Sequence, residues 1–143
     1  MLKRERGSVL LLVPAGVLVV LVLGSIAVDF AIAFLGEREV AALASAAAND
    51  AVTAAVDEAH LRETGELRLD PDRAVAVVEA TLAASSTEVD LDRPVVEVTT
   101  IDGDPAVRVR LTGRIDYVFA PALPGGPDGT DVSAVAVAVA AEG

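Results

Sequence analysis

Residues able to carry covalent, metal or acid–base chemistry are few in this sequence. The 143 residues include no cysteine and one histidine, with 22 acidic residues against 11 basic ones. This composition excludes disulfides, thiolate nucleophiles and cysteine-ligated metals, and it disfavours histidine relays and most hydrolase triads. His60 has Asp57 three residues before it and Glu63 three residues after it, on one helical face. The trio could form a metal or acid–base site, but without a second histidine a solvated helix end is the favoured interpretation.

Two further groups of polar residues also have a plain structural interpretation. Asp102 and Asp104 flank Gly103, but the further oxygen ligands and distal glutamate of a calcium loop are missing, so a turn is favoured. Ser85 and Ser86 have no G-x-S-x-G motif around them, and neither glycine-rich phosphate-binding motif occurs. The sequence thus predicts a non-enzymatic protein with no cofactor, no metal and no small-molecule substrate.

Three arginines on one face of a predicted strand are the candidate ligand-binding residues. Between residues 106 and 120 apolar residues occupy most odd positions and polar residues most even positions, which predicts a strand with one buried face. Its other face carries Arg108, Arg110 and Arg114. These arginines form either an anion-binding surface or solubilising groups on the strand. The net charge of −11 argues against nucleic acid as a partner.

A long uncharged segment near the N-terminus must position the rest of the chain. No charge occurs from Val9 to Val28, and a helix of this length, rising about 1.5 Å per residue, spans the roughly 30 Å of a bilayer core. Three basic residues within the first six predict a cytoplasmic N-terminus for a single-pass protein of the cell membrane. We expect a cytoplasmic basic leader over residues 1–7 and a transmembrane helix over residues 8–35.

The same segment also fits a cleaved secretory signal, with small residues placing the cleavage site after Ala27. A retained anchor is favoured, because the apolar run exceeds the about 7–15 residues of a signal-peptide core. As an anchor, the helix has six candidate contacts with neighbouring subunits, which are Pro14, Gly16, Gly24, Asp29, Phe30 and Phe34.

Asp29 is the acid that interrupts this apolar region. It lies about 31 Å along a helix from Ser8, near the expected outer interface of the membrane. There it would mark the end of the membrane span at little energetic cost. In a second interpretation, Asp29 is buried and pairs with a base or a free amine on a neighbouring subunit.

An alanine-rich stretch follows the apolar segment. Residues 37–63 contain neither proline nor glycine, and alanine has the highest helix propensity. We therefore expect residues 36–64 to extend the membrane helix as one rod that ends at Gly65 in a C-cap position.

A second helix is predicted from the N-cap candidate Asp70 to the serines at 85 and 86. Its expected buried residues are Val75, Val78 and Leu82.

The remaining sequence predicts an antiparallel sheet. Asp102-Gly103 is a two-residue hairpin signal between the valine- and threonine-rich segment 94–101 and the strand in 106–120. If Ile101 faces Asp104, apolar residues face apolar ones across the pair, and Glu97 faces Arg108. Residues 121–129 have the composition of a loop, and residues 132–141 alternate as a further strand. Residues 65–143 are thus expected to form an extracytoplasmic α+β domain with three or four antiparallel strands, after the long N-terminal helix.

Residues 4–56 resemble the N-terminal segment of a known family. The resemblance lies in R-G-S-V at residues 6–9, the apolar run containing Pro14, A-V-D-F at residues 27–30 and the alanine-rich residues 39–55. These features are similar to the tight-adherence (Tad/Flp) pilus-assembly proteins, the TadE- and TadG-like minor pilins or pseudopilins. The resemblance implies a pilin-like fold, subunit contacts through the N-terminal helix, and processing between Gly7 and Ser8. Leu12 stands at the fifth position after Gly7, where processed pilins carry glutamate.

The leading functional hypothesis is a bacterial, membrane-anchored accessory or minor-pilin-like component of a Tad/Flp-type pilus assembly or secretion system. Its expected partners are the membrane and other pilus-assembly subunits. The alternative hypothesis is an anchored or secreted binding module that recognises an anionic ligand through Arg108, Arg110 and Arg114.

Overall fold

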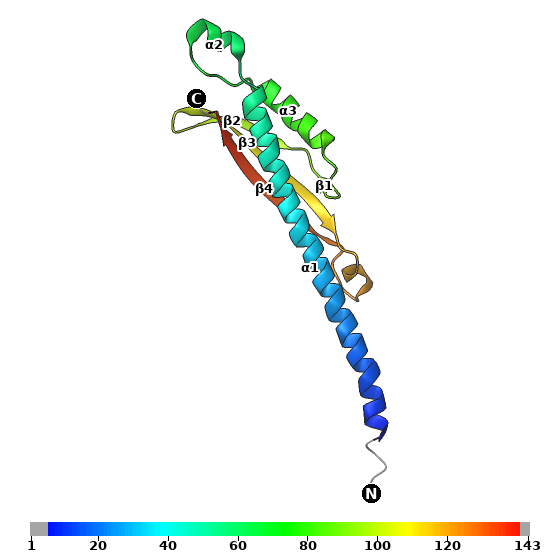
Figure 1. The fold of residues 1–143 in the computed structure, drawn as a ribbon. Helices are drawn as coiled ribbons and strands as arrows, with labels where there is room; N and C mark the ends of the chain where they lie inside the picture. The colour runs from blue at the N-terminus through cyan, green and yellow to red at the C-terminus, as the bar shows by residue number, and fades with distance from the viewer. Residues whose placement is uncertain (1–5, 141–143) are drawn as a thin grey trace.

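The structure, a computed structural model, describes residues 6–140, and the side chains of residues 12–140. A very long helix is followed by two short helices and a four-stranded antiparallel sheet (Figure 1). The elements are α1 (Arg6–Ala54), α2 (Glu58–Thr64), α3 (Pro71–Ala84), β1 (Asp90–Leu91), β2 (Val95–Ile101), β3 (Asp104–Asp116), the 3-10 helix η1 (Ala120–Ala122) and β4 (Gly129–Val139). The predicted α+β class is confirmed. Residues 1–5 of the predicted basic leader lie outside the described residues.

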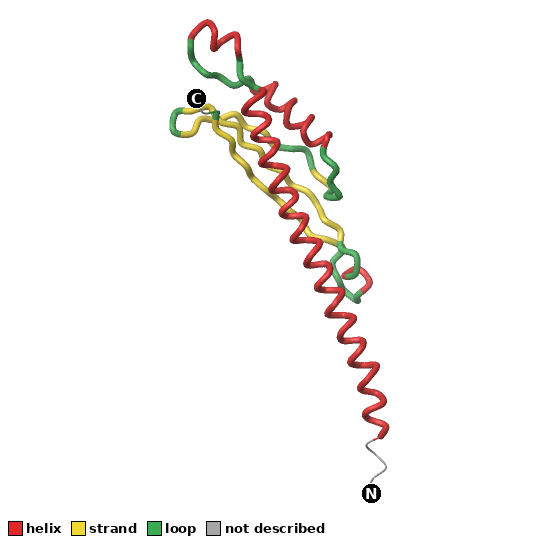
Figure 2. The backbone as a smooth tube through the Cα atoms, viewed as in Figure 1, coloured by secondary structure: helices red, strands yellow, loops and turns green. Residues whose placement is uncertain are grey.

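The sheet is built around β3, its longest strand. β4 pairs with the whole of one edge of β3, while β1 and β2 follow one another along the other edge. The C-terminal half of α1 crosses the face formed by β3 and β4, and α3 packs beside α1 over β2 (Figures 1 and 2). The N-terminal half of α1 projects beyond the sheet. The molecule is therefore elongated, with one helix shared between a packed domain and an unpacked extension.

The hairpin between β2 and β3 has the register that the sequence predicts. Ile101 pairs with Asp104, and Glu97 pairs with Arg108, whose guanidinium lies 3.3 Å from the Glu97 carboxylate. The turn residues Asp102 and Gly103 have φ values of 53° and 100°, a left-handed pair that aspartate tolerates and glycine favours. The turn geometry accounts for this aspartate and glycine standing together.

Small residues let α1 lie close to the sheet. The buried residues of its C-terminal half recur at intervals of three and four, on one helical face: Val40, Ala44, Ala47, Ala48 and Ala51. They pack in one core with the inward-facing residues of β3, including Val107, Val109 and Leu111. At Gly36 a methyl group would run into the side chain of Ile115, so glycine is needed for this close approach. An alanine-rich helix face therefore provides one side of the core.

The predicted continuous rod over residues 36–64 is wrong, because the helix is broken after Ala54. The N–H of Asp57 donates to the Arg68 carbonyl at 2.8 Å, and the N–H of Asp70 donates to the Ala55 carbonyl at 2.8 Å. These bonds pair the chain with a segment that returns antiparallel to it, so the helical bonds cannot continue. Asp57 then caps α2 by accepting from the N–H of His60 at 3.0 Å. The predicted end at Gly65 is confirmed, with φ of 74°.

The start of α3 is as predicted, but one of its buried residues is not. The Asp70 carboxylate accepts from the N–H groups of Asp72 and Arg73 at 2.9 and 3.2 Å, and Pro71 occupies the first helical position. Val78 is fully buried and Leu82 partly buried. Val75 is 38% exposed, whereas Ala74, one helical turn before Val78 on the same face, is fully buried.

Strand β4 packs its small face inward. It begins at Gly129, three residues before the predicted start, and it pairs with β3 along its full length. Ala138 is buried, and Ala134 and Ala136 are partly buried against the core. The valines of the alternating pattern, Val135, Val137 and Val139, are 42–53% exposed on the other face. Alternation predicts the strand, but the proximity of α1 decides that alanine faces inward.

Candidate functional site

The carboxylate of Asp29 binds a turn of the folded domain. Asp29 is only 5% exposed, and it accepts hydrogen bonds from the backbone N–H groups of Val118 at 2.9 Å, Phe119 at 3.2 Å and Ala120 at 2.6 Å. These three consecutive amides lead into η1, where N–H groups lack helical partners. A carboxylate is a strong acceptor for such groups. Asp29 thus fixes the point at which α1 leaves the domain.

Asp29 is buried, as in the second sequence interpretation, but the partners that the structure shows are backbone N–H groups of its own chain. Its place at the end of the membrane span stays a prediction. Both carboxylate oxygens accept hydrogen bonds from the same chain, about ninety residues further on. The contact also ends β3 at Asp116, so the predicted strand over 106–120 is four residues too long. Tyr117 and Phe119, expected as inward strand residues, lie instead in the turn bound to Asp29. No local sequence pattern links an acid in an apolar helix to a turn so distant.

We call the contact region the junction, defined as residues Ile26–Phe30 of α1 together with the segment Tyr117–Pro127. A cavity of about 280 Å³ lies within it. Its walls are mostly apolar and come from both segments: Ile26, Asp29, Phe30, Tyr117, Ala120, Leu123, Gly126 and Pro127. Figure 1 shows η1 and its flanking loop as the part of the domain nearest the N-terminal end of α1.

The other predicted contact residues of α1 stay accessible. Pro14 lies inside the helix without ending it. A methyl group added at Gly16 or Gly24 would meet no atom within 4 Å. Phe30 is 73% exposed and Phe34 57% exposed, with the Arg38 guanidinium 5.6 Å from the Phe34 ring centre.

The predicted processing position lies at the start of the same helix. Gly7 and Ser8 belong to the first turn of α1, which begins at Arg6. Of the residues that the sequence singles out on this helix, the structure therefore brings only Asp29, and the edge of Phe30 that lines the junction cavity, into contact with the domain.

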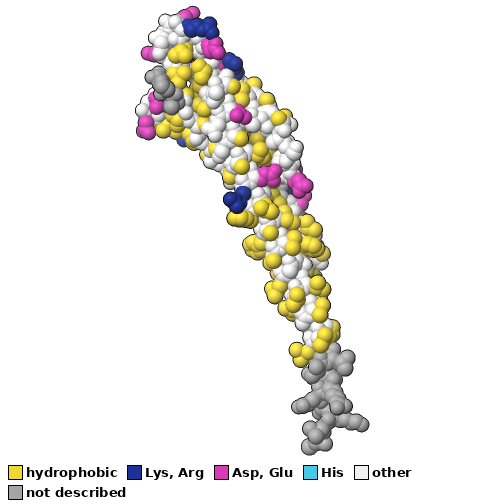
Figure 3. All heavy atoms as spheres, viewed as in Figure 1, with side chains coloured by type: hydrophobic (Ala, Val, Ile, Leu, Met, Phe, Trp, Pro, Cys, Tyr) yellow, Lys and Arg dark blue, Asp and Glu magenta, His cyan; other side chains and the backbone are white. Residues whose placement is uncertain are grey.

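α1 has a largely exposed apolar surface from Leu12 to Val28. It contains one stretch long and apolar enough, by length and composition, to cross a membrane. Figure 3 shows hydrophobic side chains along this part of the helix, below the charged side chains of the domain. Large side chains more than half exposed on it include Leu12, Val13, Val17, Leu18, Val19, Val20, Leu21 and Leu23.

The predicted arginine face is largely neutralised. Arg108 pairs with Glu97, and Arg114 lies 3.4 Å from Asp131 and 3.6 Å from Asp116. Arg110 is exposed and forms no ion pair with any residue that the structure describes. The three arginines share a strand face, but two of them are occupied by acids of the same chain.

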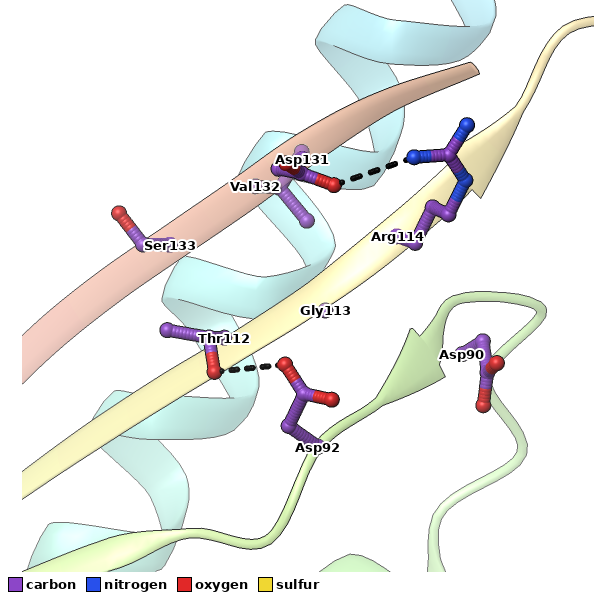
Figure 4. Close-up of a pocket in the computed structure, with 8 residues that line it drawn as sticks. All are labelled: Asp90, Asp92, Thr112, Gly113, Arg114, Asp131, Val132 and Ser133. Carbon is purple, nitrogen blue, oxygen red and sulfur yellow. Dashed lines mark hydrogen bonds and ion pairs between the residues drawn. The ribbon is translucent and has the colours of Figure 1, made fainter. Parts of the chain in front are cut away.

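Acidic residues gather in a cleft at one end of that face. The cleft, of about 590 Å³, opens where β1 leaves β3, and Asp90, Asp92 and Asp131 line it (Figure 4). The Thr112 hydroxyl donates to Asp92 at 2.9 Å, and Arg114 pairs with Asp131. Within residues 6–140 no group of three or more acidic or histidine side chains is arranged to hold a metal ion. The cleft is a polar surface feature in which Asp92 and Asp131 already have partners.

Comparison with known proteins adds no relative: no protein-family model, no curated protein and no solved structure matches this chain.

Proposed function

We propose that this protein is a single-pass, membrane-anchored accessory or minor-pilin-like subunit of a Tad/Flp-type pilus assembly or secretion system. Its N-terminus is cytoplasmic and its sheet domain extracytoplasmic. The observation that carries the proposal is the division of α1 into an exposed apolar half and a half packed on an antiparallel sheet. The resemblance over residues 4–56 implies this arrangement, and it supplies the pilus context.

The length of the unpacked part of α1 supports membrane anchoring. The domain first contacts the described side chains of the helix at the junction, so the expected span begins at Ser8 and reaches the domain at Ile26. These helical residues rise about 28 Å, close to the thickness of a bilayer hydrocarbon core. The span expected over residues 8–35 is therefore better drawn to end near Ile26, since Asp29 and Ile32 are in contact with the domain.

The surface of this half supports lateral packing with other subunits. Gly16 and Gly24 leave open space beside the backbone, which allows another helix to approach closely. Phe30 and Phe34 are exposed on the same helix, close to the point where it meets the domain. Asp29 is occupied within the chain, so we assign the subunit contacts to the glycines and phenylalanines rather than to an ion pair.

Single cysteines test the subunit contacts, because the native chain has no cysteine. In membranes of the native host, we expect Gly16→Cys and Gly24→Cys, alkylated with a thiol-reactive photo-cross-linker, to form cross-links to other pilus-assembly subunits on illumination. Asp72→Cys, at the exposed start of α3, serves as the matched control and should form none. A protein that stays un-cross-linked at all three positions, together with unchanged piliation after gene deletion, would contradict the proposal.

The mature N-terminus separates the three processing alternatives. Mass analysis of the native protein should find a start at Met1 for a retained anchor, at Ser8 for prepilin processing or at Val28 for a cleaved signal. Cleavage after Ala27 would remove the exposed apolar half but leave Asp29 bound to its turn. A start at Val28 therefore overturns membrane anchoring while leaving the domain fold intact.

An anion-binding module is the second candidate function, and one observation favours it. Arg110 projects from the middle of β3 and pairs with no acid among the described residues. If an anionic ligand is found, we expect Arg110→Glu to abolish its binding and Arg108→Gln to weaken it less, because Arg108 is already paired. Equal loss in both variants would argue against this site.

A further inference from the structure

All four phenylalanine and tyrosine residues of this chain lie at the junction or within one helical turn of it. The sequence contains three phenylalanines, one tyrosine and no tryptophan. Phe30 and Phe34 lie one helical turn apart on α1, about 6 Å along its axis. Tyr117 and Phe119 lie on the turn that Asp29 holds at the same level, with the Phe119 N–H bonded to that carboxylate. An aromatic side chain with a polar tip, such as that of Tyr117, is typical of the membrane–water interface, and the phenylalanines add apolar surface near it.

The segment from Tyr117 to Pro127 is also uncharged and exposed. It reads YVFAPALPGGP, with Asp116 before it and Asp128 after it. Val118 is 62% exposed and Phe119 42% exposed, and Pro121, Ala122 and Pro124 are exposed as well. Eleven uncharged residues with outward apolar side chains contrast with a chain in which 23% of residues are charged. Such a surface is suited to a partner that takes up apolar side chains without charge pairing.

The position of this segment selects the partner. Among the described elements of the domain, η1 and its loop lie nearest the exposed half of α1 (Figures 1 and 3). The apolar surface of the helix continues into the loop through Ile26 and Phe30, which line the junction cavity together with Leu123 and Pro127. With the helix crossing the hydrocarbon core from Ser8 to about Ile26, the loop falls at the level of the lipid headgroups.

We propose that the segment Tyr117–Pro127 is a second membrane contact, which enters the headgroup layer of the bilayer that α1 spans. Its partner is the lipid surface itself, recognised through apolar and aromatic side chains and not through lipid charge. The inference rests on the membrane anchoring in the proposed function. Two attachment points, the helix and the loop, set the depth and tilt of the sheet domain above the membrane, and Asp29 holds them together.

The absence of tryptophan from the sequence makes a direct test simple. The full-length chain is reconstituted in phosphatidylcholine vesicles whose acyl chains carry bromine, a contact quencher of tryptophan emission. Each of three variants has a single tryptophan: Phe119→Trp at the loop, Val20→Trp in the exposed half of α1, and Val137→Trp on the outer face of β4. Val118→Trp is a second loop probe, because its side chain is more exposed than that of Phe119.

We expect the emission of Phe119→Trp to lie at shorter wavelength than that of Val137→Trp. Its emission should be quenched most by bromine on the part of the acyl chain nearest the headgroups. Val20→Trp should be quenched most by bromine deep in the chains, and Val137→Trp by neither. If the loop probes are unquenched, like Val137→Trp, while Val20→Trp is quenched, the loop contact is overturned and the membrane anchor stands. The partner of this surface would then be a protein. An unquenched Val20→Trp overturns the anchor and the loop contact together.

Discussion

The two halves of α1 belong to one continuous helix but have opposite surroundings. Residues 12–26 carry leucine and valine on every face, and most of these side chains are more than 40% exposed. Residues 40–54 carry mainly alanine, and a stripe of them is completely buried against the sheet. The more apolar half is the one without intramolecular partners. Side-chain size, and not hydrophobicity, therefore decides which half of the helix the domain covers.

The comparison indicates what each half requires of its surroundings. A face of alanine lets the sheet approach to within methyl contact, so many weak contacts form over a short distance. A face of leucine and valine would hold the sheet away from the helix, and its exposed surface instead matches the hydrocarbon of a bilayer. Asp29 and the junction lie between the two, where the helix changes from one environment to the other.

The largest difference between the two halves should come from truncating a large side chain in each environment. Leu111 is fully buried under α1, and Leu111→Ala should destabilise the domain by about 2–5 kcal/mol through lost contacts and a residual cavity. Leu21→Ala, in the exposed half, should leave domain unfolding unchanged. Denaturant unfolding in detergent micelles, followed by circular dichroism, measures both. Equal effects would mean that the exposed half packs on the domain.

Enlarging a buried alanine should test the role of side-chain size. Ala47 is fully buried, and Ala47→Leu should cost about 1–3 kcal/mol, because the added atoms force the helix away from β3 and β4. Ala46→Leu, one residue earlier on the exposed face, is the matched control and should change stability little. If both variants unfold like the native protein, the close helix–sheet packing is not rigid.

Removing the carboxylate at the junction should loosen the connection locally. Asp29→Ala leaves three backbone N–H groups without their acceptor, at a cost of about 1–2 kcal/mol. Hydrogen exchange of the amides of residues 118–120 should then become faster, with the amides of β3 unaffected. Asp29→Asn retains one side-chain oxygen and should show a smaller increase. Unchanged exchange in both variants would mean that Asp29 does not hold this turn.

The smallest effect is expected on the outer face of the sheet. Glu97 and Arg108 are 59% and 43% exposed, so their pairing should contribute only about 0.2–1 kcal/mol. A double-mutant cycle with Glu97→Gln and Arg108→Gln measures this coupling, which should fall as salt concentration rises. If this coupling energy exceeded the loss of stability caused by Ala47→Leu, it would contradict the view that the helix side of the sheet dominates stability.

Features with a local cause were predictable from the sequence. The register of the β2–β3 hairpin follows from an aspartate–glycine turn and from side chains that alternate on both strands. The start of α3 follows from Asp70 and Pro71, whose conformations and hydrogen bonds involve only their neighbours. The break after Ala54 was not predictable in this way, because its cause is the return of residues 68–70 and not a proline or a glycine. The local sign available was Asp57, an N-cap residue inside the alanine-rich run.

The sequence by itself determined the apolar N-terminal helix, the alanine-rich packing surface, the hairpin and the α+β class, because composition and periodicity act over a few residues. Only the tertiary structure decided that the alanines of β4 face inward while Val135, Val137 and Val139 face outward, and that β3 stops at Asp116. It also decided that Asp29 receives three amides from a turn about ninety residues away. These outcomes depend on how closely α1 approaches the sheet and on which polar groups that approach brings together. Neither the closeness of this approach nor the pairing of these polar groups can be read from a single segment of the sequence.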